Sequence, residues 1–292
     1  MGEAIGFIGT GVMGEPMCRN IILKSGRPVV AFDLNPEPLA RLRADGATIA
    51  GSLDELVAGC ADILLSLPGG AQVEAVTLGA GGLVAKLKPG QCLVDASTAP
   101  VSLARRLEAA CQGRGALFAD APVARTRQAA IDGTLSIMVG GTAAVFDRIR
   151  PILDCCAAEL THCGAAGAGQ AVKILNNMVL FQTVVALSEA KAIATANGID
   201  PQVVFETFTK GSADSFALRN HGMKAILPDQ FPEQAFPVTY AEKDLSYALE
   251  MAREAGIDPL GAEAARAMLE RARAAGFGPN YFPVLSRTVG RG

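Results

Sequence analysis

The chain has 292 residues, of which half are apolar, 19% are charged and 5% are aromatic, and its formal net charge is −3. This is a globular composition with enough apolar material for one large domain or two ordinary ones. The charge provides no broad basic field, which argues against nucleic acid or an anionic membrane surface as a partner. Any anion that the protein binds must be held by local groups.

The seven cysteines stand mostly among apolar neighbours and form no C-x-x-C pair. We interpret them as buried, reduced thiols, which favours a cytoplasmic protein. The N-terminus shows no recognisable signal peptide. Because the spacing of the cysteines and of His162 and His221 fits no common structural zinc site, we predict no metal.

The first half of the chain alternates short apolar strands with helices. We expect a helix over 12–26 and strands over 4–9, 28–33, 61–68, 91–98, 116–123 and 135–141. Continuous apolar strands between helices are typical of a parallel sheet covered on both faces. The sequence therefore predicts an α/β fold whose N-terminal domain holds a doubly wound parallel sheet of the Rossmann type.

The second half is helical in its periodicity. A long helix is expected from Gln170 to Ala196, ending at Asn197-Gly198, because both residue types tolerate the left-handed conformation at a helix end. Polar residues interrupt its apolar tract, so we interpret it as a buried helix rather than a membrane span. Further helices are expected at 201–210, 213–226, 240–255, 259–275 and 281–289.

A Gly/Ala-rich segment at 163–169 separates the two patterns and favours a domain boundary there. We predict an NAD-binding Rossmann domain over 1–164 and an all-α domain over 165–292. The long helix would lead the second domain.

Residues 9–14 read GTGVMG, a GxGxxG motif between a predicted strand and a predicted helix. In this context the first glycine permits a tight turn and the second lets the backbone approach a pyrophosphate. The third lets helix and strand pack closely. The loop residues assigned to a dinucleotide cofactor are Gly9, Gly11, Val12, Met13 and Gly14.

Asp33 ends the second predicted strand, 24 positions after Gly9. A carboxylate at this place accepts hydrogen bonds from the adenosine ribose and repels a 2′-phosphate. The next residue is Leu34 rather than an arginine. The sequence therefore favours NAD over NADP.

Later strand ends supply further candidates. Leu67, Pro68 and Thr98 are expected to border the cofactor, because ligands bind outside the carboxyl ends of parallel strands. For Thr98, an ordinary strand-end hydroxyl is an equally good interpretation.

Lys173 and Asn177 are four positions apart on the long helix and share one face. A lysine in an apolar setting is suited to proton transfer near neutral pH, because desolvation disfavours its charged form. A lysine whose ammonium reaches solvent at the start of the helix is the alternative.

Four separated segments together resemble the β-hydroxyacid dehydrogenases, the family of 3-hydroxyisobutyrate dehydrogenase and 2-hydroxy-3-oxopropionate reductase. They are GFIGTGVMGEPM (6–17), DAPV with AIDGTLSIMVGG (120–141), GAGQAVKILNNM (167–178) and AEKDLSYAL (241–249). The resemblance runs across nearly the whole chain. It implies a cleft between a Rossmann domain and a helical domain, and a homodimer or homotetramer formed through the helical domain.

The resemblance also assigns roles. Lys173 would be the general acid/base, and Asn177 would orient it or the substrate, while the cofactor carries the hydride. Lys243 would lie near the nicotinamide ribose or the substrate, and Asp244, its neighbour in the same motif, would belong to the substrate site.

One departure from the family stands directly after DAPV. The family usually has Ser-Gly-Gly there, whereas this chain has Ala124-Arg125-Thr126, so the usual carboxylate cradle is missing. The loop resembles the Gly-Arg-Thr of sulfolactaldehyde reductases, which handle a sulfonate. We expect Arg125 and Thr126 to bind the acid group of the substrate beside Val123 and Ala124.

Two points about this pocket stay open. Arg125 would alternatively form a salt bridge with Asp214 or with a neighbouring subunit, and Arg127 is expected to face solvent. Asp214 would line the pocket, where a carboxylate repels an anion unless it is paired, or binds a hydroxyl or amino group instead.

The sequence thus predicts an NAD(H)-dependent 3-hydroxyacid dehydrogenase or semialdehyde reductase with a small anionic substrate. That substrate is either a sulfonate such as sulfolactaldehyde or an ordinary carboxylate such as 3-hydroxyisobutyrate or tartronate semialdehyde. A catalytically inactive cofactor-binding relative is the second class of function. The presence of Lys173 argues against that class, and also against the imine reductases, which share the architecture but usually lack this lysine.

Overall fold

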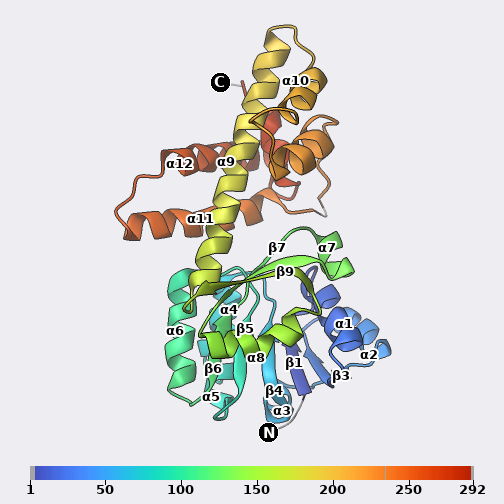
Figure 1. Ribbon diagram of the computed structural model, residues 1–292, viewed down its shortest axis with the longest axis vertical. Helices are drawn as coiled ribbons and strands as arrows, with labels where there is room; N and C mark the ends of the chain where they lie inside the picture. Colours follow the sequence, from blue (N-terminus) through green and yellow to red (C-terminus); the bar gives the residue numbers. More distant parts are fainter. Residues whose placement is uncertain (1–3, 234, 291–292) are drawn as a thin grey trace. The chain divides into compact units, whose positions relative to one another are not determined.

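The computed structural model describes residues 4–233 and 235–290. The chain forms two compact units, one ending at Lys173 and the other beginning at Ile174 (Figure 1). The division falls inside the long helix α9 (Ala168–Ala196), nine residues after the predicted boundary at 164/165. The first six residues of α9 therefore belong to the Rossmann unit.

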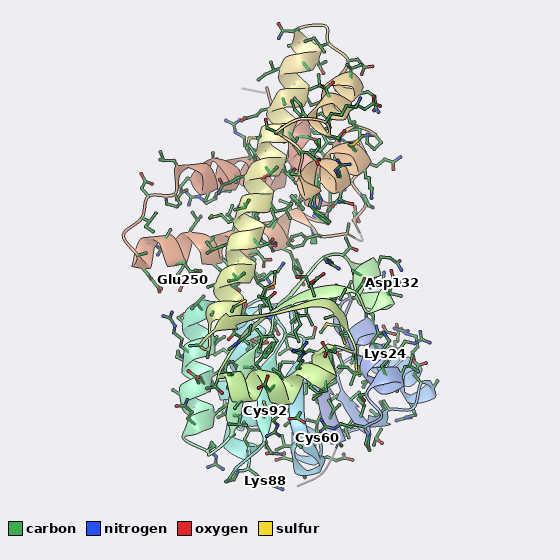
Figure 2. The ribbon with its side chains drawn as sticks, in the orientation of Figure 1. Lys24, Cys60, Lys88, Cys92, Asp132 and Glu250 are labelled. Carbon is green, nitrogen blue, oxygen red and sulfur yellow. The ribbon has the colours of Figure 1, made fainter. Side chains whose placement is uncertain are left out.

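The first unit contains a sheet of nine strands in the described part of the chain, in the order β3-β2-β1-β4-β5-β6-β8-β7 with β9 beside β8. From β1 to β6 every pairing is parallel, and the order 3-2-1-4-5-6 is that of a Rossmann sheet. Cys60 and Cys92, labelled in Figure 2, begin β4 and β5 and mark the amino edge of the sheet. The strands are β1 (Ala4–Ile8), β2 (Val29–Phe32), β3 (Thr48–Ile49), β4 (Cys60–Leu65), β5 (Cys92–Asp95), β6 (Leu117–Asp120), β7 (Val123–Ala124), β8 (Leu135–Gly140) and β9 (Ala157–Gly164).

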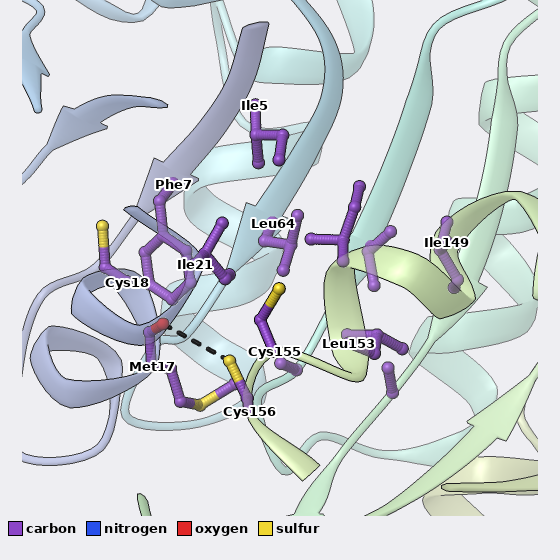
Figure 3. Packing of buried hydrophobic residues seen from close by; sticks show 14 of the residues in the cluster. Ile5, Phe7, Met17, Cys18, Ile21, Leu64, Ile149, Leu153, Cys155 and Cys156 are labelled. Atoms are coloured by element: carbon purple, nitrogen blue, oxygen red, sulfur yellow. Dashed lines mark hydrogen bonds between the residues drawn. The ribbon is translucent and has the colours of Figure 1, made fainter. Parts of the chain in front are cut away.

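Helices cover both faces of this sheet because successive strand side chains point to opposite sides. On β4, Leu64 joins the core under α1, α2 and α8, whereas Ile63 and Leu65 join the core under α3 to α6. Figure 3 shows the first of these cores, where Phe7 and Ile21 pack together. The helices are α1 (Gly14–Lys24), α2 (Pro36–Ala44), α3 (Leu53–Gly59), α4 (Gly70–Leu78), α5 (Leu83–Lys86), α6 (Val101–Gln112), α7 (Arg127–Asp132) and α8 (Ala143–Leu153).

The fold confirms the doubly wound parallel sheet and corrects its last strands. β8 runs antiparallel to β6 and β7, because the short α7 is the only helix between them and a parallel return needs a longer crossover. The strand β9 was not predicted. Its eight residues are mostly exposed or half-buried, so they lack the apolar run by which a buried strand is found.

The second unit is helical, as predicted. Phe181 of α9 packs against Phe236 and, edge to face, against Phe282. The segment predicted as a helix over 213–226 is a wider π-helix that begins at Leu218, and the last predicted helix is 3-10. The elements after α9 are α10 (Pro201–Phe208), the π-helix (Leu218–Ile226), α11 (Val238–Glu254), α12 (Leu260–Ala272), a short π-helical turn (Arg273–Phe277) and the 3-10 helix (Phe282–Thr288).

A buried carboxylate ties the amino edge of the sheet together. Asp62 of β4 is 3% exposed. It pairs with Arg27, just before β2, at 2.7 Å and with Arg148 of α8 at 2.8 Å. Arg148 also donates to the carbonyls of Gly90 at 2.8 Å and Ala61 at 3.1 Å. One anion therefore links two strands, a helix and the turn before β5.

We predict that Asp62→Ala lowers the free energy of unfolding by about 3 kcal/mol, because it leaves two guanidinium groups without their buried counterion. Urea unfolding followed by circular dichroism measures this loss. The matched control is Asp54→Ala, whose partner is Lys86 and whose carboxylate is 71% exposed. It should change stability by less than about 1 kcal/mol. Equal losses for the two variants would contradict the prediction.

Candidate active site

The glycine-rich loop after β1 leaves little choice of residue at two of its glycines. Gly9 has a φ of +91°, and a Cβ there would lie 2.3 Å from the Ser66 carbonyl oxygen. A Cβ on Gly14 would lie 2.0 Å from the carbonyl oxygen of Gly9, whereas a Cβ on Gly11 would meet nothing within 4 Å. The open backbone at Gly11 and the start of α1 fit a pyrophosphate. The cofactor contacts of this loop stay a prediction.

Asp33 is tied to this loop. Its Oδ2 accepts hydrogen bonds from the Thr10 backbone N–H at 2.5 Å and from Thr10 Oγ1 at 3.0 Å. Its Oδ1 accepts from the Asn35 N–H at 2.8 Å. Thr10 was not singled out from the sequence, since it occupies a variable position of the motif. The neighbouring Leu34 is 92% exposed and offers no charge to a 2′-phosphate.

Two buried carboxyl groups stand side by side at the carboxyl edge of the sheet. Asp95 ends β5, Asp120 ends β6, and the two are register partners, both fully buried. Burial raises the pKa of Asp95 to about 7 and raises the pKa of Asp120 as well. Sequence reasoning missed both, although each is a lone acid at the end of an apolar strand.

Asp95 belongs to a network that reaches the predicted cofactor residues. Its Oδ1 accepts from the Ser97 N–H at 2.9 Å, and Ser97 Oγ accepts from the Leu67 N–H at 2.9 Å. Asp95 Oδ2 is buried without a hydrogen-bond partner. The half-buried Thr98 follows Ser97 directly.

Asp120 caps the helix that carries the candidate catalytic lysine. Its two oxygens accept from the backbone N–H groups of Gly167 at 2.6 Å and Gln170 at 2.7 Å. A carboxylate is favoured at this place because the first N–H groups of a helix lack partners. The cap explains why α9 begins at Ala168, two residues before the predicted start. Lys173 follows within the next turn and is 8% exposed.

The second unit brings three of the predicted site residues together. Asn177 Nδ2 donates to Asp244 Oδ2 at 2.7 Å, and both side chains are buried. Lys243 Nζ lies 3.2 Å from Asp244 Oδ1 as an ion pair. It also lies over the rings of Tyr240 and Tyr247, 5.1 and 5.8 Å from their centroids. The tyrosines were not predicted, although their positions three before and four after Lys243 place them on its helix face.

In the loop after β7, Arg125 and Thr126, which were expected to bind the acid group of the substrate, make hydrogen bonds within the protein. Arg125 has a φ of +85°, in the left-handed region that favours glycine, and its Nη1 donates to the Thr134 carbonyl at 2.7 Å. Thr126 Oγ1 accepts from the Ala129 N–H at 3.4 Å and so caps α7. Both side chains are exposed, as is Arg127. Threonine is a common helix cap, and Thr126 has this role at the start of α7.

Asp214 has a partner in its own unit. Arg219 Nε and Nη2 contact its two oxygens at 2.8 and 2.9 Å, and this pairing lowers the pKa of Asp214. The carboxylate that would repel an anionic substrate is therefore neutralised by a bidentate guanidinium. Arg219 was not foreseen.

Comparison with known proteins identifies the family. Residues 4–164 match the model for the NAD binding domain of 6-phosphogluconate dehydrogenase. Residues 167–282 match the model for the NAD-binding region of NADP-dependent 3-hydroxyisobutyrate dehydrogenase. The chain belongs to the 3-hydroxyisobutyrate dehydrogenase family. This is a family of NAD(P)-dependent oxidoreductases that act on CH–OH groups, so the predicted enzyme class is confirmed.

Individual relatives align over most of their length. The chain is 36% identical to 2-(hydroxymethyl)glutarate dehydrogenase of Eubacterium barkeri, over 94% of this chain and 90% of the relative. It is 37% identical to 3-hydroxyisobutyrate dehydrogenase of Pseudomonas aeruginosa, over 88% of each chain. The solved structure of Mycobacterium tuberculosis 3-hydroxyisobutyrate dehydrogenase with L-serine has a TM-score of 0.88 at 30% identity, covering 99% of this chain and all of that one.

The buried Asp95 predicts a pH dependence of stability in this dehydrogenase. Because its pKa rises from 3.8 to about 7 on folding, the folded state binds more protons than the unfolded state between these values. The free energy of unfolding that Asp95 contributes should therefore fall as pH rises from about 4 to about 7, and stay low above that.

Asp95→Asn, which mimics the protonated acid, should remove this contribution. Its stability should match the wild type near pH 4 and exceed it near pH 8, measured by urea unfolding across that range. His221 titrates in both proteins and cancels in the difference, whereas Asp120 lies beside Asp95 and its charge is part of what raises the pKa of Asp95. A difference between the two proteins that does not change with pH would contradict the prediction.

Proposed function

We propose that this enzyme is an NAD(H)-dependent 3-hydroxyacid dehydrogenase, or semialdehyde reductase, acting on a small anionic substrate. The observation that carries the proposal is the placement of Lys173. Its side chain is buried near the start of α9, and Asp120 anchors that start to the carboxyl edge of the sheet. Ligands of Rossmann domains bind at this edge, which supports a role for Lys173 at the reacting atoms.

The proposed chemistry divides between the cofactor and three side chains. When bound, the nicotinamide supplies or accepts the hydride at C4. Lys173 gives a proton to the carbonyl oxygen during reduction and removes the hydroxyl proton during oxidation. Asn177 orients the lysine or the substrate, and its hydrogen bond to Asp244 fixes the direction of its amide. Lys243 serves the nicotinamide ribose or the substrate.

NAD is the proposed cofactor. Thr10 holds the carboxylate of Asp33 beside the glycine-rich loop, where it would accept hydrogen bonds from ribose hydroxyls. The exposed Leu34 provides no cation for the additional phosphate of NADP. Both observations support NAD over NADP.

Arg125 is the proposed ligand of the substrate's acid group. One of its N–H groups holds the Thr134 carbonyl, which leaves others to donate to an anion, since a guanidinium has five. Thr126 Oγ1 can donate its own proton while it accepts from Ala129. A sulfonate such as sulfolactaldehyde and an ordinary carboxylate both fit this chemistry. The relatives are named for carboxylate substrates, which favours a carboxylate. The pair Arg125 and Thr126 favours a sulfonate.

Two further proposals concern the cellular compartment and the oligomeric state of the enzyme. Six of its seven cysteines are buried and all are free thiols, which supports a reducing compartment such as the cytoplasm. Assembly into a homodimer or homotetramer through the helical unit follows from the family resemblance.

We predict that Lys173→Met lowers kcat/KM by roughly 10²- to 10⁴-fold, the usual contribution of a general acid/base, without weakening NADH binding. The assay uses NADH and NADPH with sulfolactaldehyde, tartronate semialdehyde and methylmalonate semialdehyde. Lys191→Met is the matched control, because Lys191 lies on the same helix and donates to the Ile226 carbonyl. If Lys173→Met behaves like this control, the proposed function is wrong.

We predict that Arg125→Gly raises KM for the anionic substrate roughly 10- to 100-fold, as the loss of a charge-assisted hydrogen bond implies, with little change in kcat. Glycine adopts the φ of +85° without strain, so the loop should keep its shape and the protein its Tm. Arg127→Ala, in the same loop, should leave KM unchanged. An unaltered KM in Arg125→Gly would exclude Arg125 as the anion ligand.

A further inference from the structure

We infer that Gln170 is a positioning residue that fixes Lys173 relative to Thr98, and thereby aligns the proton-transfer group with the nicotinamide side of the site. This rests on the roles proposed above for Lys173 and Thr98. Gln170, Lys173 and Thr98 all belong to the first compact unit.

The side chain of Gln170 forms hydrogen bonds with the backbone on both sides of Thr98. Its Nε2 donates to the Ser97 carbonyl at 2.7 Å, and its Oε1 accepts from the Ala99 N–H at 3.0 Å. Gln170 is fully buried, so water cannot readily replace either bond. The carboxamide thus clamps the segment that carries the Thr98 hydroxyl.

The backbone of Gln170 is held equally firmly. Its N–H donates to Asp120 Oδ2 at 2.7 Å. Lys173 stands three residues later, on the neighbouring position of the same helix surface. A single residue therefore connects the end of β5, the end of β6 and the helical turn that presents the lysine.

The connection through Gln170 should affect catalysis as well as stability. Hydride and proton must be delivered to the two atoms of one carbonyl group, so an error of about 1 Å in the position of either donor can lower the rate roughly 100-fold. Loss of the clamp should therefore reduce kcat, while the groups that bind cofactor and substrate remain in place.

The chain contains a matched control at the other end of β5. Gln91 precedes β5, is 2% exposed, and donates through Nε2 to the carbonyls of Val57 at 2.8 Å and Cys60 at 2.7 Å. Its Oε1 accepts from the N–H of Lys88 at 2.7 Å. Gln91 and Gln170 are thus equally buried clamps of backbone, and one lies at the edge away from the proposed site.

The experiment compares Gln170→Met with Gln91→Met. Both should lower Tm by a similar amount, since each leaves buried backbone groups unpaired. Only Gln170→Met should lower kcat, roughly 10- to 100-fold. It should also raise the primary isotope effect measured with 4-deuterated NADH, as hydride transfer becomes rate-limiting. Substrate KM and NADH Kd should change less than about threefold. If Gln170→Met does not fold, Asp120→Asn tests the same anchor with the clamp intact, and a smaller change in the same direction is expected.

The outcomes separate the inference from the function on which it rests. A normal kcat and isotope effect in Gln170→Met, together with an inactive Lys173→Met, would overturn the positioning role and leave the proposed function standing. An equal loss of kcat in Gln91→Met would also overturn it, because the effect would then follow stability. A fully active Lys173→Met would remove the proposed function and the inference together.

Discussion

The hydrogen bonds from the start of α9 to the Asp120 carboxylate are the interaction on which the candidate site depends. Two N–H groups of the helix start meet a fully buried anion at the end of β6. Close approach is needed on every side: a Cβ on Gly140 would lie 2.4 Å from Asp120 Oδ1, and one on Gly169 would lie 2.8 Å from Oδ2. Only glycines at these places allow strand, carboxylate and helix to meet, so the position of Lys173 is fixed by the sheet.

This arrangement has an electrostatic cost that shapes the neighbourhood. For Asp120, burial outweighs the hydrogen bonds and raises its pKa. Hydrogen bonds stabilise the charged form of Asp95 less, since one of its oxygens has no hydrogen-bond partner. Two adjacent buried carboxyl groups are most stable when one stays neutral. The helix start favours the anion on Asp120, so the proton belongs on Asp95. The edge then carries one charge, directed at the helix that bears the candidate catalytic lysine.

The sequence predicted the parts of the molecule that have a local signature. Apolar strands, the glycine-rich turn and the long helix each show a period or a motif, and the sheet order and α9 agree with them. The sequence did not predict which residues far apart along the chain would pair. Nothing in the sequence pairs Asp120 with Gln170 or Asn177 with Asp244, because such pairs form only when the chain folds back on itself. The antiparallel β8 was missed for a related reason, since strand direction depends on the path of the connection.

The loop after β7, which we propose binds the substrate, would let one family fold carry a different recognition group. The resemblance places the usual Ser-Gly-Gly of the family at 124–126, and Arg125 has a left-handed φ of +85° where that motif has its first glycine. A non-glycine residue there is strained by roughly 1–3 kcal/mol, which the hydrogen bond to Thr134 and the Thr126 cap partly offset. Strain of this kind persists where a side chain has a use that glycine cannot supply. The hydrogen bonds that hold the start of α9 on Asp120 do not involve Arg125 or Thr126, so under the proposed roles recognition can change while the reaction stays the same.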